Sequence, residues 1–471
     1  MASEIRVNKI INRSGLSTVT FSDTGAIVSG IVTANSFSGA VTGSGANLTS
    51  IPAGQLTGTV ADARLSTVSS SKLSGALPAL DGSALTGVGL GTDGSANTSG
   101  IITATAFVPT TQGSLSHRNI VINGAMTVAQ RGTSSTSNLY ATVDRFRFAY
   151  SGVDENPTNA QVDVASGTTP YTLGFRKALK VTNGNQTSGA GSADRIAFEY
   201  RIEAQDIAGS GWNYTSASSN ITLSFWIKSS VAQNFHFYFE TVDGTAQIYP
   251  MSTGTLSADT WTKITKTIPG NSNIQIDNNN EMGLKLYFSY FTGTDYTNNS
   301  QSLNAWGAYS SASRFPDDTS TWYTTNDSTL EMTGLQLEVG PVATPFEHRS
   351  LQEELIRCQR YFNMIGDGTN FGTNKALSDA FMWSANEIDF MYTFPVEMRT
   401  TPSLYQVTGS DYFQVQGGGH NTHIDGNFTQ QYGCKRSTSQ YAGSDSSRTS
   451  GASCHITVKN SAARYGYNAE L

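Results

Sequence analysis

Aromatic side chains in polar, glycine-rich stretches are the residues of this sequence whose chemistry is easiest to specify. The face of an indole or phenol ring stacks on the apolar face of a pyranose, while nearby polar groups bond the sugar hydroxyls. Two loop-like segments, NAWGAYSS and DDTSTWYTTND, each hold a pair of rings. We therefore predict a ligand-binding site of this type that draws on Trp306, Tyr309, Trp322, Tyr323, Trp212, Tyr412 and Tyr432. The alternative for each ring is packing inside a β-sandwich or a subunit interface.

Histidines and carboxylates give weaker patterns. His420 and His423 stand three apart in GGGHNTHID, a spacing that puts two side chains on opposite faces of a strand. This spacing favours solvent-exposed loop histidines over metal ligands. No calcium loop of the EF-hand type is present. We predict no cofactor and no metal ligand; the alternative is a structural calcium ion bound by Asp317, Asp318 and Asp327.

Catalytic motifs are not recognisable in the sequence. No Ser or Cys stands with a His and an orienting acid in a known pattern. Carboxylate pairs such as Asp154–Glu155 are adjacent in sequence, as in solvated turns. We predict no catalytic residues and a protein that is not an enzyme. A glycan depolymerase needs two carboxylates about 5–10 Å apart in a cleft, and the sequence leaves that alternative open.

The composition indicates a mainly β protein of several domains. Of 471 residues, 14% are charged, 10% are aromatic and 46 are glycine, a mixture typical of strands joined by many turns. A net charge of −7 without a basic stripe argues against a nucleic-acid partner. No apolar run is long enough for membrane insertion. Three cysteines without a secretory signal predict free thiols made in a cytoplasm, with a Cys434–Cys454 bond as the alternative.

The N-terminal part of the chain repeats itself. The phrase SGIVTANSF at 29–37 returns as SGIITATAF at 99–107. Each unit joins a short β-branched run to a glycine turn, so each is a strand too short to bury its own face. We predict an N-terminal attachment segment at 1–28 and a repetitive β stalk at 29–116, in which three chains share one axis. The alternative is a flexible linker.

Dense strand patterns follow the repeats. Between 221 and 227, apolar residues alternate with Thr222, Ser224 and Trp226, which predicts a strand with one buried face. Many such strands predict a jelly-roll β-sandwich over residues 117–349 and a C-terminal β tip domain over 363–471. The tip domain contains a loop-like stretch at 409–452. In the sandwich, strands are predicted at 119–123, 144–150, 178–182, 221–230, 234–242, 261–268, 283–291 and 330–339.

A short helix is predicted between the two β domains, at residues 350–362. Ser350 and Glu353 form a capping box, and Glu353 and Arg357 form an i,i+4 pair. Apolar residues at coiled-coil spacing predict a collar on a three-fold axis, with an interface formed by Leu351, Leu355, Cys358 and Phe362. The alternative is a single helix that packs on the sandwich.

Several of these phrases resemble tail-fibre and receptor-binding proteins of tailed bacteriophages, especially marine phages and cyanophages. SGIVTANSFSG resembles their repeated linkers, and NIVINGAMTVAQRGT followed by VDRF resembles the opening of a carbohydrate-binding-module-like jelly roll. LQLEVGPVATPFEHRS resembles the closing strand of that domain. EELIRCQRYF resembles the helix that follows it, and FPVEMRTTPSL the start of a distal β domain. The phrases occur in the order expected for such fibres and touch most of the chain.

The resemblance implies an elongated, homotrimeric fibre in the virion tail, made in the host cytoplasm. Its N-terminus is expected to bind tail hub or adaptor proteins, and its C-terminal side to meet the host. The expected function is host recognition and adsorption through a surface glycan, either lipopolysaccharide or capsule. Two alternatives stay open, namely a fibre-borne glycan depolymerase and a purely structural tail component.

Overall fold

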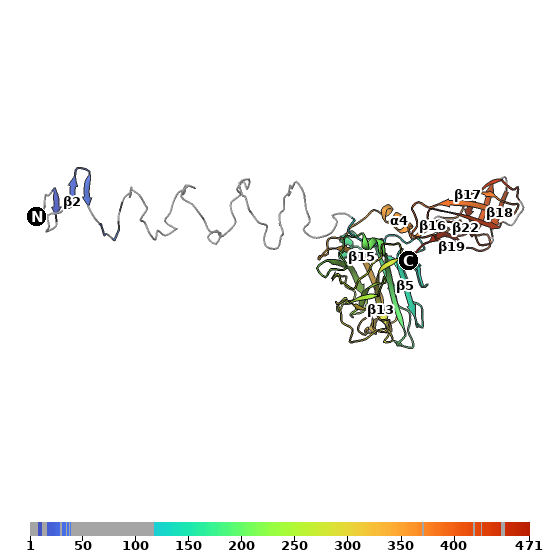
Figure 1. The fold of residues 1–471 in the computed structure, drawn as a ribbon, viewed down its shortest axis with the longest axis horizontal. Coiled ribbons are helices and arrows are strands. Elements are labelled where there is room, and N and C mark those ends of the chain that lie inside the picture. The colour runs from blue at the N-terminus through green and yellow to red at the C-terminus, as the bar shows by residue number, and fades with distance from the viewer. Residues whose placement is uncertain are drawn as a thin grey trace. The chain divides into compact units, whose positions relative to one another are not determined.

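The computed structural model describes residues 8–11, 17–28, 31–33, 35–36, 38, 117–369, 372–417, 420–424, 426–443 and 448–471. The chain divides into two units, residues 1–103 and 104–471. In the first unit, β1 (Lys9–Ile11), β2 (Ser17–Ser22) and β3 (Gly25–Val28) form an antiparallel sheet, blue in Figure 1. Most of the predicted stalk at 29–116 lies outside the described residues, so the stalk stays a prediction.

The second unit begins with a β-sandwich of two six-stranded antiparallel sheets (Figure 1). The first sheet, called the β10 sheet, runs in the order β14 (Gly307–Ala308), β11 (Gln247–Ser252), β10 (His236–Thr241), β13 (Met282–Thr292), β8 (Arg195–Glu203) and β5 (Phe146–Ser151). The second, called the β9 sheet, runs in the order β12 (Thr262–Pro269), β9 (Asn220–Ser229), β15 (Thr329–Val339), β7 (Lys177–Thr182), β6 (Thr158–Asp163) and β4 (Ser134–Ser135).

The alternating side chains of these strands build the core between the sheets. Phe225 of β9 lies 5.5 Å, ring to ring, from Phe237 of β10 and 6.2 Å from Phe288 of β13. Rings from both sheets therefore interlock in one apolar layer. The predicted mainly β architecture is confirmed, since nearly all the regular structure of the described residues is strand.

Most predicted strands are present within a few residues, but the strand at 119–123 is wrong. That segment has irregular backbone ending in a turn, because the side chain of Asn119 takes the place of a strand partner. Its Oδ1 accepts hydrogen bonds from the backbone N–H groups of Val121 and Leu337, each at 3.0 Å. The prediction also missed β6, β8 and β11. Strand β11 carries Pro250, a residue that argues against a strand assignment in a sequence.

Four short helices belong to the described part of the chain: α1 (Thr169–Thr172), α2 (Ala204–Ala208), α3 (Thr321–Thr324) and α4 (Leu351–Gln359). None of them is long and apolar enough to cross a membrane. The predicted N-cap of α4 is confirmed, since the Ser350 side chain accepts a hydrogen bond from the Glu353 N–H. The ion pair between Glu353 and Arg357 also forms, at 3.1 Å.

The predicted four-residue seam on this helix is wrong as drawn. Helix α4 ends at Gln359, and Phe362 begins the following strand. Cys358 and Phe362 are fully buried inside the chain, whereas Leu351 is 62% exposed and Leu355 is half-buried. The helix packs on its own chain, as in the alternative reading, because nine residues give too little length for a coiled coil.

The C-terminal domain packs a three-stranded sheet beside a seven-stranded one. The smaller sheet runs in the order β16 (Phe362–Asp367), β25 (Arg464–Asn468) and β19 (Ser403–Val407). The larger one, called the β18 sheet, runs in the order β21 (His420–Ile424), β20 (Phe413–Gly417), β24 (Ser453–Val458), β17 (Lys375–Met382), β18 (Glu387–Thr393), β23 (Ser437–Gly443) and β22 (Thr429–Gly433).

The stretch at 409–452, predicted as loop-like, contains four of these strands. His420 and His423 are therefore strand residues of β21 and not loop histidines. His423 forms an ion pair with Asp411, and its Nε2 lies 3.2 Å from the side-chain nitrogen of Gln414. Glycine, serine and asparagine between these strands are typical of turns, and for that reason the sequence suggested a loop although Phe413, Val415 and Ile424 are core residues.

A buried charge cluster joins the C-terminal residues to the sandwich. The Glu470 carboxylate pairs with both Arg131 and Arg145, and all three side chains are at most 3% exposed. The Arg131 guanidinium lies 3.5 Å from the ring centre of Phe362, and that of Arg145 lies 3.4 Å from the ring centre of Tyr361. The last strand of the chain is thus anchored to the first strands of the sandwich.

Candidate functional site

The strongest candidate site is a hollow on the outer face of the β9 sheet, of about 390 Å³. It is bounded by the sheet, by the turn after α1 and by the segment that leaves β15. Its lining is mostly apolar and aromatic, the usual character of a small-molecule site. We call it the Trp226 pocket, and it is lined by Leu173, Phe175, Ser224, Trp226, Lys263, Gly334, Ala343, Thr344, Pro345, Phe346 and His348.

The indole of Trp226 is presented by a central strand. Trp226 pairs with Lys263 of β12 on one side and with Thr333 of β15 on the other. The residues directly before and after it, Phe225 and Ile227, are buried between the sheets. Because successive side chains of a strand point to opposite faces, Trp226 faces outward, and it is half-buried. A ring held in this way by two flanking strands has a fixed orientation.

A β-bulge shapes the floor of the pocket. The register between β15 and β9 shifts between Thr333 and Gln336, and Gly334 adopts a φ of +67°. A Cβ on Gly334 would lie 2.6 Å from Cζ of Phe175, so only glycine lets that ring pack against the strand.

Two more rings form the rim. Phe346 lies 4.9 Å from Phe175, and the imidazole of His348 lies 5.0 Å from Phe175, ring centre to ring centre. Nε2 of His348 is 2.9 Å from the carbonyl oxygen of Leu173. The rim rings are thus tied to one another and to the chain around the pocket.

The polar groups of the pocket are hydroxyls and cations. Ser224 lies two residues before Trp226 on β9, and the exposed Lys263 lies on the neighbouring strand β12. No carboxylate is among the lining side chains. Glu338 of β15 accepts hydrogen bonds from the N–H and the hydroxyl of the lining residue Thr344. The arrangement can stack a flat apolar face and donate hydrogen bonds to its polar edge, but its lining holds no acid–base pair.

Three of the seven rings predicted to bind ligand are core residues, and these predictions are wrong. Trp212, Trp322 and Tyr323 are at most 3% exposed. The ring of Trp322 lies 5.5 Å from that of Tyr290, and the hydroxyl of Tyr323 donates to Asp194 at 2.9 Å. Polar neighbours in the sequence suggested loops, but α3 turns both of its rings into the sandwich.

The other four predicted rings lie in different places. Trp306 is half-buried and donates from Nε1 to the carbonyl of Pro269 at 2.6 Å. Tyr309 packs on the outer side of the β10 sheet, and Tyr412 packs half-buried on the core of the C-terminal domain. Only Tyr432 among the seven is highly exposed, at 73%.

Sequence reasoning did not include Trp226 among the candidate rings, although the sequence places it on the outer face of a strand. The alternation at 221–227 places Trp226 on the same face as Thr222 and Ser224, opposite the core residues. The position of a ring in the alternation of a strand predicts its exposure better than polar neighbours in the sequence do, because alternation fixes the face of the sheet to which the ring points.

The aspartates considered for calcium, Asp317, Asp318 and Asp327, do not form a cluster of metal-binding side chains in the described part of the chain. Asp317 accepts hydrogen bonds from Thr297 and Asn299, whereas buried Asp318 faces Nδ1 of His236 at 2.8 Å and accepts from Ser289. Across the described residues no group of three or more metal-binding side chains is found. The contacts of Asp318 fasten the loop before α3 to the β10 sheet, a constellation that the sequence did not reveal.

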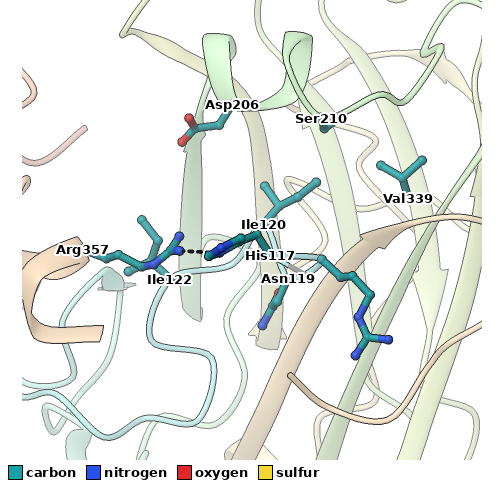
Figure 2. A pocket seen from close by; sticks show the side chains of 9 residues that line it. His117, Asn119, Ile120, Ile122, Asp206, Ser210, Val339 and Arg357 are labelled. Carbon is teal, nitrogen blue, oxygen red and sulfur yellow. Dashed lines mark hydrogen bonds between the residues drawn. The ribbon is translucent and has the colours of Figure 1, made fainter. Parts of the chain in front are cut away.

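A second, smaller cavity of about 200 Å³ lies where the described sandwich begins. Its lining includes His117, Asp206 of α2 and Arg357 of α4, and Figure 2 shows the hydrogen bond from Arg357 to His117. Arg357 is also paired with Glu353, and burial together with nearby Glu203 raises the pKa of Asp206. This cavity has no tryptophan, tyrosine or phenylalanine face, so it suits a stacked ring less well than the Trp226 pocket.

Comparison with protein-family models gives no match, and comparison with curated proteins gives none either. Among solved structures, the enzymatically active domain of tailspike protein 4 from bacteriophage CBA120 is similar at 10% identity, over 47% of this chain and 21% of that one, with a TM-score of 0.27. This chain thus spans about a fifth of that structure's length.

Two further solved structures are similar over the same share of this chain. A putative sugar-binding protein from Bacteroides thetaiotaomicron has 10% identity, coverage of 47% of this chain and 99% of that one, and a TM-score of 0.26. The carbohydrate-binding module TmCBM61, in complex with β-1,4-galactotriose, has 9% identity, coverage of 47% and 97%, and a TM-score of 0.23. Similarity this low leaves the ligand to be inferred from the pocket itself.

Proposed function

We propose that this chain is a subunit of a virion tail fibre that binds a glycan on the host surface through the Trp226 pocket. The observation that carries the proposal is the fixed, half-buried indole of Trp226 in a hollow with hydroxyl and ammonium groups at its edge. A pyranose offers such a hollow an apolar face and a ring of hydroxyl acceptors, which is the complement of this lining.

Binding without cleavage is the proposed mode of action. Glycoside hydrolysis by the usual route needs two carboxylates on either side of the scissile bond, and the lining of the Trp226 pocket contains neither Asp nor Glu. Incubation of the protein with a bound polysaccharide is expected to release no reducing ends and no unsaturated products. Release of either would favour a depolymerase.

Trimerisation is part of the proposal. In the first unit, Ile27 and Ile31 are 61% and 95% exposed, and Leu351 of α4 is 62% exposed. Apolar side chains that a single chain leaves in water suit burial against two further copies. Three weak glycan sites on one fibre then act together through avidity. Light scattering under native conditions is expected to give the mass of three chains, and the mass of one chain would contradict this.

The binding proposal is tested with the full chain on an array of neutral and acidic glycans. Trp226→Ala is expected to weaken binding about five- to thirtyfold, because loss of one stacked ring costs on the order of 1–2 kcal/mol. The exposed rim variant His348→Ala is expected to weaken it less. Trp261→Ala is the matched control, since Trp261 is a half-buried tryptophan directly before β12 that does not line the pocket. Equal binding by Trp226→Ala and Trp261→Ala would reject the site.

A role in adsorption is tested separately. Saturating amounts of free protein are expected to slow adsorption of a virion that carries this fibre, and the Trp226→Ala protein is expected not to. Adsorption that both proteins leave unchanged would favour a purely structural tail component. The proposed anchoring to tail hub or adaptor proteins rests on the N-terminal phrases and is tested by their capture with residues 1–116.

A further inference from the structure

The outer face of the β18 sheet carries a second cluster of exposed side chains, far in sequence from the Trp226 pocket. Met391 of β18 pairs with Ser439 of β23, and Ser439 pairs with Tyr432 of β22. The three side chains therefore form one row across three neighbouring strands, with the serine in the middle. Neighbouring strands lie about 4.8 Å apart, so Met391 and Tyr432 stand about 10 Å from each other. We call this row the Tyr432 face.

The two ends of the row are open to solvent, and the middle is a hollow. Met391 is 69% exposed and Tyr432 is 73% exposed, values that are unusual for large apolar side chains on a sheet. Between them lies a shallow cavity of about 360 Å³, which the turn after β22 closes on one side. It is lined by Met391, Tyr432, Gly433, Cys434, Ser437, Thr438 and Ser439.

The floor of the hollow contains a polar group without a partner. Oγ of Ser439 is covered by the side chains around it, yet it makes no hydrogen bond within the described residues. In the adjacent row, Oδ1 of Asp389 is in the same condition. Buried polar atoms are normally paired, so Ser439, which lines the hollow, has an unused capacity for a hydrogen bond, whereas Asp389 does not line the hollow.

The composition of the lining indicates which kind of ligand fits. No charged side chain lines the hollow, and the guanidinium of Arg436, in the turn beside the hollow, is paired with Glu397 at 2.9 Å. An acidic sugar would thus find no counter-ion. A protein partner is disfavoured as well, because the cores of protein interfaces are depleted in serine, and Ser437 and Ser439 of β23 both line this hollow. Ring, thioether and hydroxyls together suit an uncharged, polyhydroxylated ligand.

We propose that the Tyr432 face is a second binding site, for a neutral glycan, that acts independently of the Trp226 pocket. Tyr432 stacks on the sugar, the flexible side chain of Met391 closes over its other edge, and Ser439 donates to or accepts from a hydroxyl. With one site in each β domain, the subunit binds two glycan segments, and the linkage between the sites raises the avidity.

Cys434 gives this site a direct readout. Its thiol is exposed at the edge of the hollow, whereas Cys358 and Cys454 are buried, with at most 7% exposure. Backbone hydrogen bonds from Arg436 and Ser437 lower the pKa of Cys434, which favours the reactive thiolate. Iodoacetamide is therefore expected to label the native full-length protein at Cys434, and a glycan in the hollow is expected to slow that labelling.

The experiment screens wild type, Tyr432→Ala and Trp226→Ala on an array of neutral and acidic oligosaccharides, then measures labelling with the best neutral glycan retained by Trp226→Ala. Tyr432→Ala is expected to lose binding of that glycan at least about tenfold, and the glycan is expected to slow labelling of Trp226→Ala at least about threefold. Trp383→Ala is the control, because Trp383 is a 63% exposed ring on a neighbouring hairpin outside the hollow.

The outcomes separate this site from the first one. If Trp226→Ala retains no neutral glycan while Tyr432→Ala binds as wild type does, the second site is rejected and the Trp226 pocket stands. If Tyr432→Ala loses a glycan that Trp226→Ala retains, and that glycan slows the labelling of Cys434, the second site stands whatever happens at the first. A retained glycan that leaves the labelling rate of Cys434 unchanged also rejects the second site.

Discussion

At the scale of single residues, Asp144 is a carboxyl group that the sandwich buries away from water. The side chain is 1% exposed and accepts a hydrogen bond from the Gln130 N–H at 2.9 Å. Burial raises the pKa of Asp144 from its ordinary value of 3.8 to about 6, although Arg131 pulls in the opposite direction. Between about pH 4 and pH 6, Asp144 therefore keeps its proton in the folded protein, whereas the same group has lost it in the unfolded chain.

The sign of the effect follows from that difference. The free energy of unfolding falls as the pH rises from about 4 and levels off above about 7, by about 3 kcal/mol at most for this group. Asp144→Asn is expected to remove this part of the pH dependence, as measured by urea unfolding at pH 4, 5, 6 and 7. Asp154→Asn, at an exposed carboxylate whose pKa hydrogen bonds from Ser188 lower, serves as the control. The same fall with pH in wild type and Asp144→Asn would contradict the assignment.

At the scale of elements, the bulge of β15 shapes the Trp226 pocket. Gly334→Ala would force a side chain into the left-handed region and against Phe175. We expect a loss of about 1–3 kcal/mol of stability in urea unfolding, together with weaker glycan binding. Gly307→Ala is the control: a Cβ there meets nothing within 4 Å, and a change within about 0.5 kcal/mol is expected. Equal stability of the two variants would show that the bulge tolerates a side chain.

The elements also show what the sequence could and could not predict. Alternation in 221–227 predicted β9 closely, because the side chains of a strand point alternately to the core and to the outside. The same reasoning failed at Asn119, where a side chain replaces backbone pairing, and at Trp322, where a short helix turns a loop-like segment inward. The Trp226 pocket depends on a bulge and on contacts between segments more than 100 residues apart, and no local pattern records these.

At the scale of the whole second unit, Glu470 connects the two β domains. Its carboxylate pairs with two buried arginines of the sandwich, Arg131 and Arg145. Removal of one partner leaves a buried charge uncompensated, at a cost of about 3–5 kcal/mol. Glu470→Gln is therefore expected to destabilise the protein by that amount and to split thermal unfolding into two transitions in calorimetry.

The matched control for this prediction is Glu397→Gln. Glu397 pairs with Arg436 at 2.9 Å, but the two side chains are 44% and 80% exposed. A solvent-exposed pair contributes less than about 1 kcal/mol. If Glu470→Gln were no more harmful than Glu397→Gln, the two β domains would not be held together by this cluster.

The most direct test of glycan binding by the sandwich is a crystal structure of the full second unit with the glycan whose binding Trp226→Ala weakens most on the array. A pyranose is expected to stack on the indole of Trp226, between Phe346 and Lys263, with its hydroxyls toward Ser224. The same glycan bound to this unit with the Trp226 pocket empty would contradict glycan binding by the sandwich.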